Sequence, residues 1–246
     1  MEDNFLPLLS GSAQLKLLQL VSPTLPVGAY NYSEGLEWLI EQGDVTNGDT
    51  LGAWLVEELR QGSITLDTAI MVRAYRCANQ QSNVDPIADP VIPVAKDLDY
   101  WNQWLTATRE SRELREQSLQ MGSSLRKLLL DLDPTVELLF KALPATEPCH
   151  YAIAFGVGAA FWGIDIHQSG LGYLHSWANN LISAGVRLIP LGQTTGQKLL
   201  LQLTPTILGQ WQKILVLEDD DLYSCSWGLA LASMGHESQY TRLFRS

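Results

Sequence analysis

The hydrophobic residues recur at helical spacing along most of the chain. A stripe that begins at Leu15 should end before Pro23, because the residue before a proline is disfavoured in helical geometry. Residues 50–61 and 64–79 repeat the pattern, and residues 97–132 hold enough of it for two helices. Alternating apolar and polar runs long enough to build a sheet are missing from the sequence. The pattern therefore predicts an all-α fold, a bundle of about ten helices.

A stretch of small and apolar residues after Pro148 is expected to form the central helix. Ala152, Gly156 and Gly163 fall on one face at helical spacing, so the backbone of a neighbouring helix can approach closely. The segment 151–164 is the most apolar in the chain, yet it is shorter than the ~20 residues needed to cross a bilayer. We therefore interpret it as a buried helix around which the others pack.

The remaining helices are predicted from prolines, acidic residues and apolar periodicity. Pro134 and Pro205 suit the first turn of a helix, and the acidic run from Glu218 to Asp221 suits a solvated turn and a negative helix start. On this basis we expect helices at residues 134–140, 171–188, 194–203, 205–217 and 222–233.

The stretch LPVGAYNYSEGLE, residues 25–37, places a stiff turn and two tyrosines directly before a helix. Asn31 is expected to cap that helix, with Glu34 bonding back to the cap backbone. Leu36 supplies part of its apolar face, and Gly43 should end it. Such dense local specification suits either a catalytic group or a surface that another protein recognises.

Residues 81–95 differ from the rest of the chain because they carry three prolines and have no helical period. We interpret them as an exposed loop inside a single domain that spans residues 1–246. The alternative, a domain boundary, would leave about 80 residues on the N-terminal side to build a core of their own.

The balance of charge argues against nucleic acid and anionic membranes as partners. The formal net charge is -11 and the pI is about 4.7, so phosphate groups would be repelled unless a basic patch compensated. The three cysteines, Cys77, Cys149 and Cys225, lack the spacing of a disulfide framework or a zinc site. Together with an N-terminus that lacks a secretory signal, these features predict a cytoplasmic protein.

Common catalytic motifs are missing from the sequence. Residues 192–198 resemble a phosphate loop, but their glycines are four apart rather than five and Leu199 replaces the metal-binding hydroxyl residue. The four histidines have no partner at ligand spacing, so neither a metal nor a cofactor is expected. The carboxylate pairs Glu57/Glu58 and Glu110/Glu113 are interpreted as solvated helix faces with intrahelical ion pairs.

Cys149 and His150 are the best candidates for a nucleophile and its base, because they are adjacent. Neighbours in a helix point about 100° apart, which favours a core cysteine beside a surface histidine. The sequence therefore predicts that the protein is not an enzyme. A helical hydrolase that uses this pair stays as an alternative, and it predicts activity of the isolated chain.

Uncharged polar and aromatic residues cluster instead around turns, in LPVGAYNYSEG, WANNLISAGVRLIPLGQTTGQK and SMGHESQYTRLFRS. Such residues serve recognition because they combine contact area with directional hydrogen bonds, and helix capping or core packing is the alternative for each.

At these segments the sequence resembles the urease accessory protein UreF family. LPVGAYNYSEGLE resembles its N-terminal signature, ESRELREQSLQMG its central long helix, and RLIPLGQTTGQ and RLFRS its C-terminal marks.

The resemblance covers nearly the whole chain and implies an all-α, non-enzymatic protein. It implies a homodimer that acts as an adaptor in nickel delivery to apo-urease (UreABC). It also implies binding to the accessory protein UreD, also called UreH, and recruitment of the GTPase UreG, whose GTP hydrolysis is linked to nickel insertion. A catalytic regulator of UreG, with Arg187 or Arg242 as an arginine finger, stays as the alternative.

By the same resemblance, two groups of residues are expected to contact partners. The UreD-binding group lies in the C-terminal segment 235–246 and comprises His236, Tyr240, Arg242, Leu243 and Phe244. The group at the dimer or UreG side comprises Tyr30, Tyr32, Ser33, Glu34, Arg187, Gln193, Gln197 and Lys198. For Glu34 a capping-box carboxylate, and for Arg187 a helix C-terminal cation, are the simpler alternatives.

Overall fold

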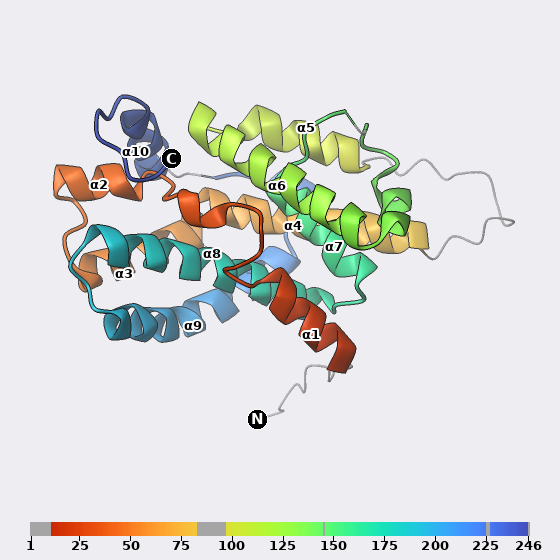
Figure 1. The fold of residues 1–246 in the computed structure, drawn as a ribbon, viewed down its shortest axis with the longest axis horizontal. Helices are drawn as coiled ribbons and strands as arrows, with labels where there is room; N and C mark the ends of the chain where they lie inside the picture. Colours follow the sequence, from red (N-terminus) through yellow and green to blue (C-terminus); the bar gives the residue numbers. More distant parts are fainter. Residues whose placement is uncertain (1–10, 83–96, 145, 225–226, 246) are drawn as a thin grey trace, which may run out of the picture.

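The computed structural model describes residues 11–82, 97–144, 146–224 and 227–245. These residues form ten α-helices and three 3-10 helices, and no strand occurs within those ranges (Figure 1). The prediction of an all-α fold is therefore confirmed. The predicted proline-rich loop lies outside the described residues from residue 83 onward.

Several helices begin at the polar caps that their sequences supply. The side chains of Asn47, Ser111 and Asp165 accept hydrogen bonds from the first backbone N–H groups of α3, α6 and α8. The α-helices are α1 Gly11–Leu20, α2 Leu36–Gln42, α3 Gly48–Gln61, α4 Ser63–Ser82, α5 Leu98–Thr108, α6 Arg112–Leu132, α7 Tyr151–Phe161, α8 Ile166–Leu188, α9 Gln193–Leu215 and α10 Trp227–Glu237. The 3-10 helices are η1 Ala29–Asn31, η2 Pro134–Phe140 and η3 Asp219–Asp221.

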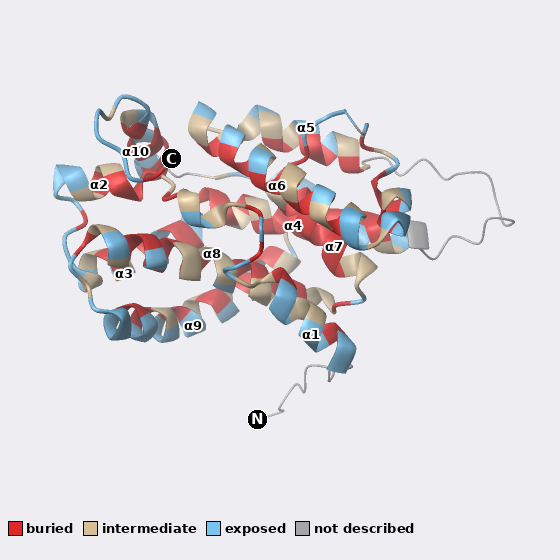
Figure 2. Cartoon of the chain, viewed as in Figure 1, coloured by how far each residue is buried: buried red, intermediate tan, exposed pale blue. Residues whose placement is uncertain are grey.

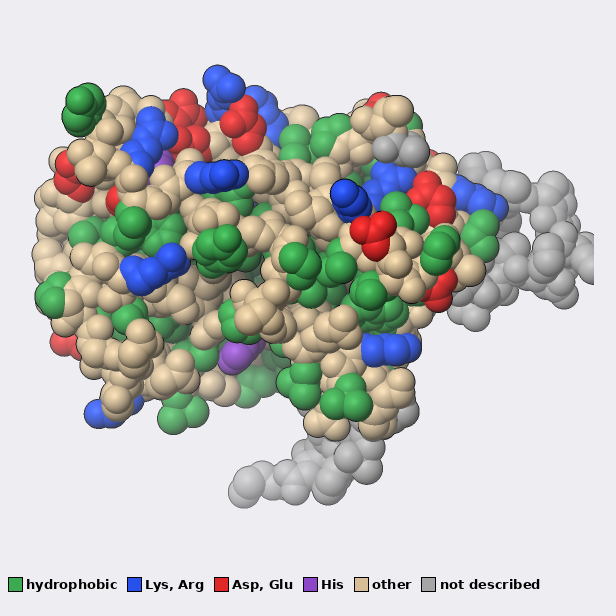
Figure 3. All heavy atoms as spheres, viewed as in Figure 1, with side chains coloured by type: hydrophobic (Ala, Val, Ile, Leu, Met, Phe, Trp, Pro, Cys, Tyr) green, Lys and Arg blue, Asp and Glu red, His purple; other side chains and the backbone are tan. Residues whose placement is uncertain are grey.

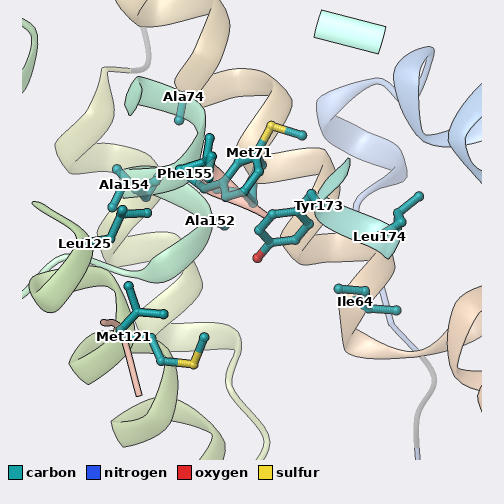
Figure 4. Close-up of a cluster of buried hydrophobic side chains, with 14 of the residues drawn as sticks. Ile64, Met71, Ala74, Met121, Leu125, Ala152, Ala154, Phe155, Tyr173 and Leu174 are labelled. Atoms are coloured by element: carbon teal, nitrogen blue, oxygen red, sulfur yellow. The ribbon is translucent and has the colours of Figure 1, made fainter. Parts of the chain in front are cut away.

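The apolar helix α7 lies at the centre, packed mainly against α4 and α6. Gly156 of α7 approaches α4 so closely that a Cβ there would stand 2.4 Å from the carbonyl oxygen of Met71. A Cβ on Gly122 of α6 would stand 2.0 Å from the carbonyl oxygen of Cys149. Near these approaches the side chains of Phe155 and Tyr173 pack edge to face, with Met71 close by (Figure 4). Small residues therefore set the spacing of the central helices.

The buried residues are concentrated in the central helices. The residues of α4 and α7 are mostly buried, whereas α9 turns a long exposed face to solvent (Figure 2). Within the described ranges, none of the helices is both long and apolar enough to cross a membrane. The core is thus built around α4 and α7, with the other helices covering them.

Pro205 does not begin a helix, which corrects the prediction of separate helices at 194–203 and 205–217. Instead α9 runs without interruption through Pro205. The proline lacks the N–H that would bond the carbonyl of Leu201. Because Leu201 lies on the exposed face of α9, water can reach that side of the helix and replace the missing partner.

Three other predicted helices differ from the observed ones. Residues 134–140 form a 3-10 helix, α8 begins at Ile166 rather than at residue 171, and α10 begins at Trp227 rather than at residue 222. The acidic run forms the 3-10 helix η3 instead of opening α10, and its Asp219 accepts a hydrogen bond from Arg73 of α4 at 2.7 Å.

Candidate partner-binding site

The C-terminal tail, residues 238–245, folds back onto α2. The carboxylate of Glu37 accepts hydrogen bonds from two consecutive backbone N–H groups, that of Leu243 at 2.6 Å and that of Phe244 at 2.9 Å. Hydrogen bonds to a charged acceptor are stronger than neutral ones. The ring of Phe244 is buried, whereas Tyr240 and Leu243 stay exposed. The tail is thus held in one shape and presents two large side chains to solvent.

A buried charge cluster fixes the start of this tail. The two ring nitrogens of His236 face two carboxylates, Glu113 at 2.7 Å from Nδ1 and Glu37 at 3.3 Å from Nε2. Arg242 donates to the other oxygen of Glu113 at 2.9 Å. Both ring contacts are donor hydrogen bonds when the imidazole carries two protons. The side chain of His236 is fully buried, so a partner reaches neither it nor Phe244 without moving the tail.

The tail also contacts the turn at residues 28–33, which we call the signature turn. The backbone N–H of Arg245 donates to the carbonyl of Asn31 at 2.8 Å. The guanidinium of Arg187 lies 4.4 Å from the centre of the Phe244 ring and donates to the carbonyl of Tyr30 at 2.9 Å. Two segments that the resemblance assigns to different partners therefore lie in contact with each other.

Within the signature turn the two tyrosines have different environments. The side chain of Tyr30 is exposed, while Tyr32 is buried and its hydroxyl donates to Gln120 of α6 at 2.8 Å. Burial raises the pKa of the Tyr32 hydroxyl, so it stays protonated as a donor. Ser33 is buried, and its hydroxyl accepts from the backbone N–H of Glu37 at 3.4 Å. Tyr30 is thus the tyrosine that a partner can reach directly.

Glu34 does not form the predicted capping box, and Asn31 does not cap α2. Asn31 ends η1, and α2 follows Gly35, whose φ of 78° lies in the left-handed region that favours glycine. Glu34 itself has a φ of 53°, and its carboxylate points inward, accepting from Gln117 at 3.1 Å and from the indole of Trp177 at 3.0 Å. Burial raises the pKa of this carboxyl. Its position is therefore set by α6 and α8, which no local pattern reveals.

A cavity of about 270 Å³ lies beneath the signature turn. The ion pair between Asp67 and Arg109, 2.6 Å long, lines its wall together with Glu34 and Tyr173. Burial raises the pKa of Asp67, and the neighbouring Arg109 opposes that effect. Arg109 also donates to Ser118, which in turn contacts His150. Contacts among these polar groups link α4, α6 and α8 beneath the signature turn.

Gln193, Gln197 and Lys198 lie apart from the tail, on the exposed side of the first turns of α9. The buried side of this segment faces α3 and α8, where Gly196 approaches Ile182 and Val186. Of the residues expected on the UreG side, Arg187 contacts the tail directly and Tyr30 is linked to it through Arg187. Tyr32, Ser33 and Glu34 lie in or beside the same turn, whereas Gln193, Gln197 and Lys198 lie on α9.

The interpretation of Cys149 and His150 is corrected. His150 is fully buried, and its ring nitrogens contact the hydroxyls of Ser118 at 2.9 Å and Thr106 at 3.0 Å. Burial lowers the pKa of His150 to about 3, and the nearby positive charges of Arg109 and Arg115 contribute to a smaller extent. Burial raises the pKa of the Cys149 thiol to about 12. A thiol that stays protonated beside a neutral, fully engaged imidazole is not an activated nucleophile.

The carboxylate pairs are also less solvated than predicted. Glu58 is buried, Glu110 accepts from Ser224 at 2.8 Å, and Glu113 belongs to the His236 cluster. Sequence reasoning missed Glu37 altogether. Glu37 lies in the first turn of α2, where carboxylates are common because they favour the helix N-terminus, so its sequence position does not reveal its distant partners.

The polar clusters of the described residues thus hold segments of the chain together, and none of them places an activated nucleophile beside a base. This arrangement defines an all-α protein whose polar clusters join its helices and its tail. Comparison with known proteins identifies it more closely. A family model described as UreF matches residues 45–204.

Curated relatives match over almost the whole length. The chain is 80% identical over 239 residues to the urease accessory protein UreF of Synechocystis sp., covering 97% of this chain and 100% of the relative. It is 54% identical to the protein of that name from Nostoc sp., covering 94% and 95%, and 40% identical to the one from Alkalilimnicola ehrlichii, covering 96% and 97%. The chain therefore belongs to the UreF family, and its role is an accessory one rather than a catalytic one.

Proposed function

We propose that this chain is a cytoplasmic adaptor in urease maturation that binds UreD (UreH) and recruits the GTPase UreG to apo-urease (UreABC) for nickel insertion. Membership of the UreF family supports the link to urease. The observation that carries the adaptor role is the contact between the C-terminal tail and the signature turn, with Tyr240 and Leu243 exposed on the tail.

This contact supports coupling between the two partners. A UreD surface that binds Tyr240 and Leu243 holds a segment that also touches Arg187 and Asn31. UreD binding would therefore stabilise the form of the signature turn that UreG meets. Because linkage between two ligands is reciprocal, UreG would strengthen UreD binding by the same factor.

The face shown in Figure 3 carries both hydrophobic and charged side chains, as protein-binding surfaces commonly do. Hydrophobic side chains cross its middle, and charged ones stand among and above them (Figure 3). Interfaces of this kind combine an apolar centre with a polar rim. The proposal includes a homodimer of this chain, which light scattering on the purified protein tests directly.

The decisive experiment separates binding from folding. The double variant Tyr240→Ala/Leu243→Ser removes two exposed side chains, so its melting temperature should equal that of the wild type. We expect copurification with UreD to fall at least about tenfold, with loss of UreG recruitment. A double variant on another exposed face, Leu132→Gln/Leu138→Gln, is the matched control. Unchanged UreD binding by the tail variant would refute the proposed role of the tail.

The alternative function, regulation of GTP hydrolysis through an arginine finger, is tested with Arg187→Ala and Arg242→Ala. Both guanidinium groups already hold contacts inside the chain, Arg187 with Phe244 and Arg242 with Glu113. An adaptor role predicts weaker assembly with unchanged GTP turnover in each complex that forms. Intact assembly with slower turnover would favour the finger. Arg112→Ala, on the exposed side of α6, is the control.

A further inference from the structure

The cavity beneath the signature turn has a polar end whose hydrogen-bonding groups are only partly used. Asp67 and Arg109 form an ion pair there, with Nη2 of Arg109 2.6 Å from Oδ1 of Asp67. The Arg109 side chain is only 5% exposed, yet its Nε has no acceptor among the described residues. Within the same ranges, the second carboxylate oxygen of Asp67 has no donor. Because buried polar groups are normally hydrogen-bonded, this end can both donate to and accept from a small molecule.

Two tyrosine hydroxyls add to this capacity. Tyr151 of α7 and Tyr173 of α8 line the cavity, and their stacked rings lie 5.7 Å apart. Neither hydroxyl has a hydrogen-bond partner in the part of the chain that the structure describes. Burial raises the pKa of both, so each stays protonated. Each can therefore donate one hydrogen bond and accept others.

Much of the remaining wall is apolar. It includes Leu20, Leu25, Val27, Ile64, Leu114 and Met121. The volume of about 270 Å³ lies near the lower limit of small-molecule sites. The cavity therefore suits a small molecule with a polar head and a short aliphatic chain.

The charges at the polar end favour a zwitterion over a single ion. Asp67 and Arg109 carry opposite charges side by side, so a lone cation or anion beside them meets one attraction and one repulsion. A molecule with adjacent positive and negative groups can face both charges favourably. Burial raises the pKa of the neighbouring Glu34, which makes its negative charge easier to remove by protonation.

Two other charge arguments leave this choice unchanged. Arg187 also lines the cavity, but it stands about 15 Å further along α8 than Trp177, which donates to Glu34. The described residues contain no group of three side chains that could hold a metal ion. A zwitterion therefore matches the polar end better than a metal does.

We propose that this cavity binds a free aliphatic α-amino acid, whose ammonium group faces Asp67 and whose carboxylate faces the Nε of Arg109. These two ligand groups share one carbon atom, as the two protein charges share one ion pair. The hydroxyls of Tyr151 and Tyr173 supply further hydrogen bonds, and the aliphatic chain lies among the apolar residues. The site uses no residue of the tail, so the inference goes beyond the adaptor function.

The test is isothermal titration calorimetry of the full chain with L-leucine and with its two halves. 3-Methylbutylammonium lacks the carboxylate, and 4-methylpentanoate lacks the ammonium group. We expect L-leucine to bind with a Kd below about 1 mM, and each half to bind at least about tenfold more weakly.

Two variants separate binding from folding. Asp67→Asn removes the negative charge and should weaken L-leucine binding at least about tenfold. Tyr173→Phe removes a hydroxyl that bonds no described residue, so the variant should melt no lower than the wild type and bind about threefold or more weakly. The exposed controls Asp131→Asn and Tyr223→Phe should bind like the wild type.

Several results would overturn the proposal. The absence of saturable binding at millimolar L-leucine would remove the site. Equal affinity for L-leucine and one of its halves would make the ligand a simple cation or anion. Wild-type affinity in both Asp67→Asn and Tyr173→Phe would place any binding elsewhere. Failure of the adaptor function is scored separately, by the Tyr240→Ala/Leu243→Ser copurification.

Discussion

His150 illustrates how burial decides the chemistry of a single residue. Its two ring nitrogens meet the hydroxyls of Ser118 and Thr106, and a neutral imidazole can donate to one and accept from the other. Protonation would break that match and place a charge in the interior near Arg109 and Arg115. The residue is therefore a neutral connector between α5, α6 and the start of α7 rather than a base.

The depressed pKa of His150 predicts a pH-dependent stability. Because the unfolded chain binds this proton more readily, stability should be fully present above about pH 6.5 and fall as the pH drops toward 3. Between pH 7 and pH 5 the wild type should lose about 2 kcal/mol more unfolding free energy than His150→Gln. Urea denaturation at each pH measures this difference. Parallel pH profiles of the two proteins would contradict the assignment.

At the scale of helices, small residues decide which elements touch. The close approaches at Gly156 and Gly122 bring α4 and the start of α7 against their neighbours. Periodicity identified these helices, because an apolar stripe is a local property of the sequence. It did not identify the continuous α9, since the loss of one hydrogen bond at Pro205 is tolerated where the helix faces solvent.

A pair of glycine substitutions tests the role of close packing. Gly156→Ala should destabilise the protein by about 1–3 kcal/mol or more, because the new methyl would collide with the α4 backbone. Gly209→Ala in α9 meets no atom within 4 Å and should stabilise by about 0.5–1 kcal/mol through helix propensity. Thermal melting of both variants measures the contrast. A stable Gly156→Ala protein would show that α7 can shift away from α4.

At the scale of the whole molecule, Glu37 links the N-terminal helix α2 to the C-terminal tail. It lies in α2, yet its carboxylate binds the backbone of Leu243 and Phe244 and contacts His236. The cost of burying this acid is offset by several donors converging on it. The tail is therefore part of the folded unit, and a truncation that removes Phe244 would also remove core packing.

Neutralising Glu37 should loosen the tail. Glu37→Gln replaces a charged acceptor and places an amide N–H₂ where a second acceptor oxygen is needed. We expect trypsin cleavage after Arg242 to accelerate about tenfold, as one charge-assisted hydrogen bond is lost. Glu41→Gln, on the exposed side of the same helix, is the control. Equal cleavage of both variants would mean that the Glu37 carboxylate does not hold the tail.

The sequence by itself determined the helical class, the central position of α7 and the segments that mark the UreF family. These depend on local periodicity, on small residues at helical spacing and on short motifs, all of which are contiguous in the chain. Only the tertiary structure decided how the recognition residues meet. His236 lies 199 residues from Glu37 and 123 from Glu113, and Arg187 reaches the tail from α8. Such contacts depend on how helices pack in space, so no local pattern specifies them.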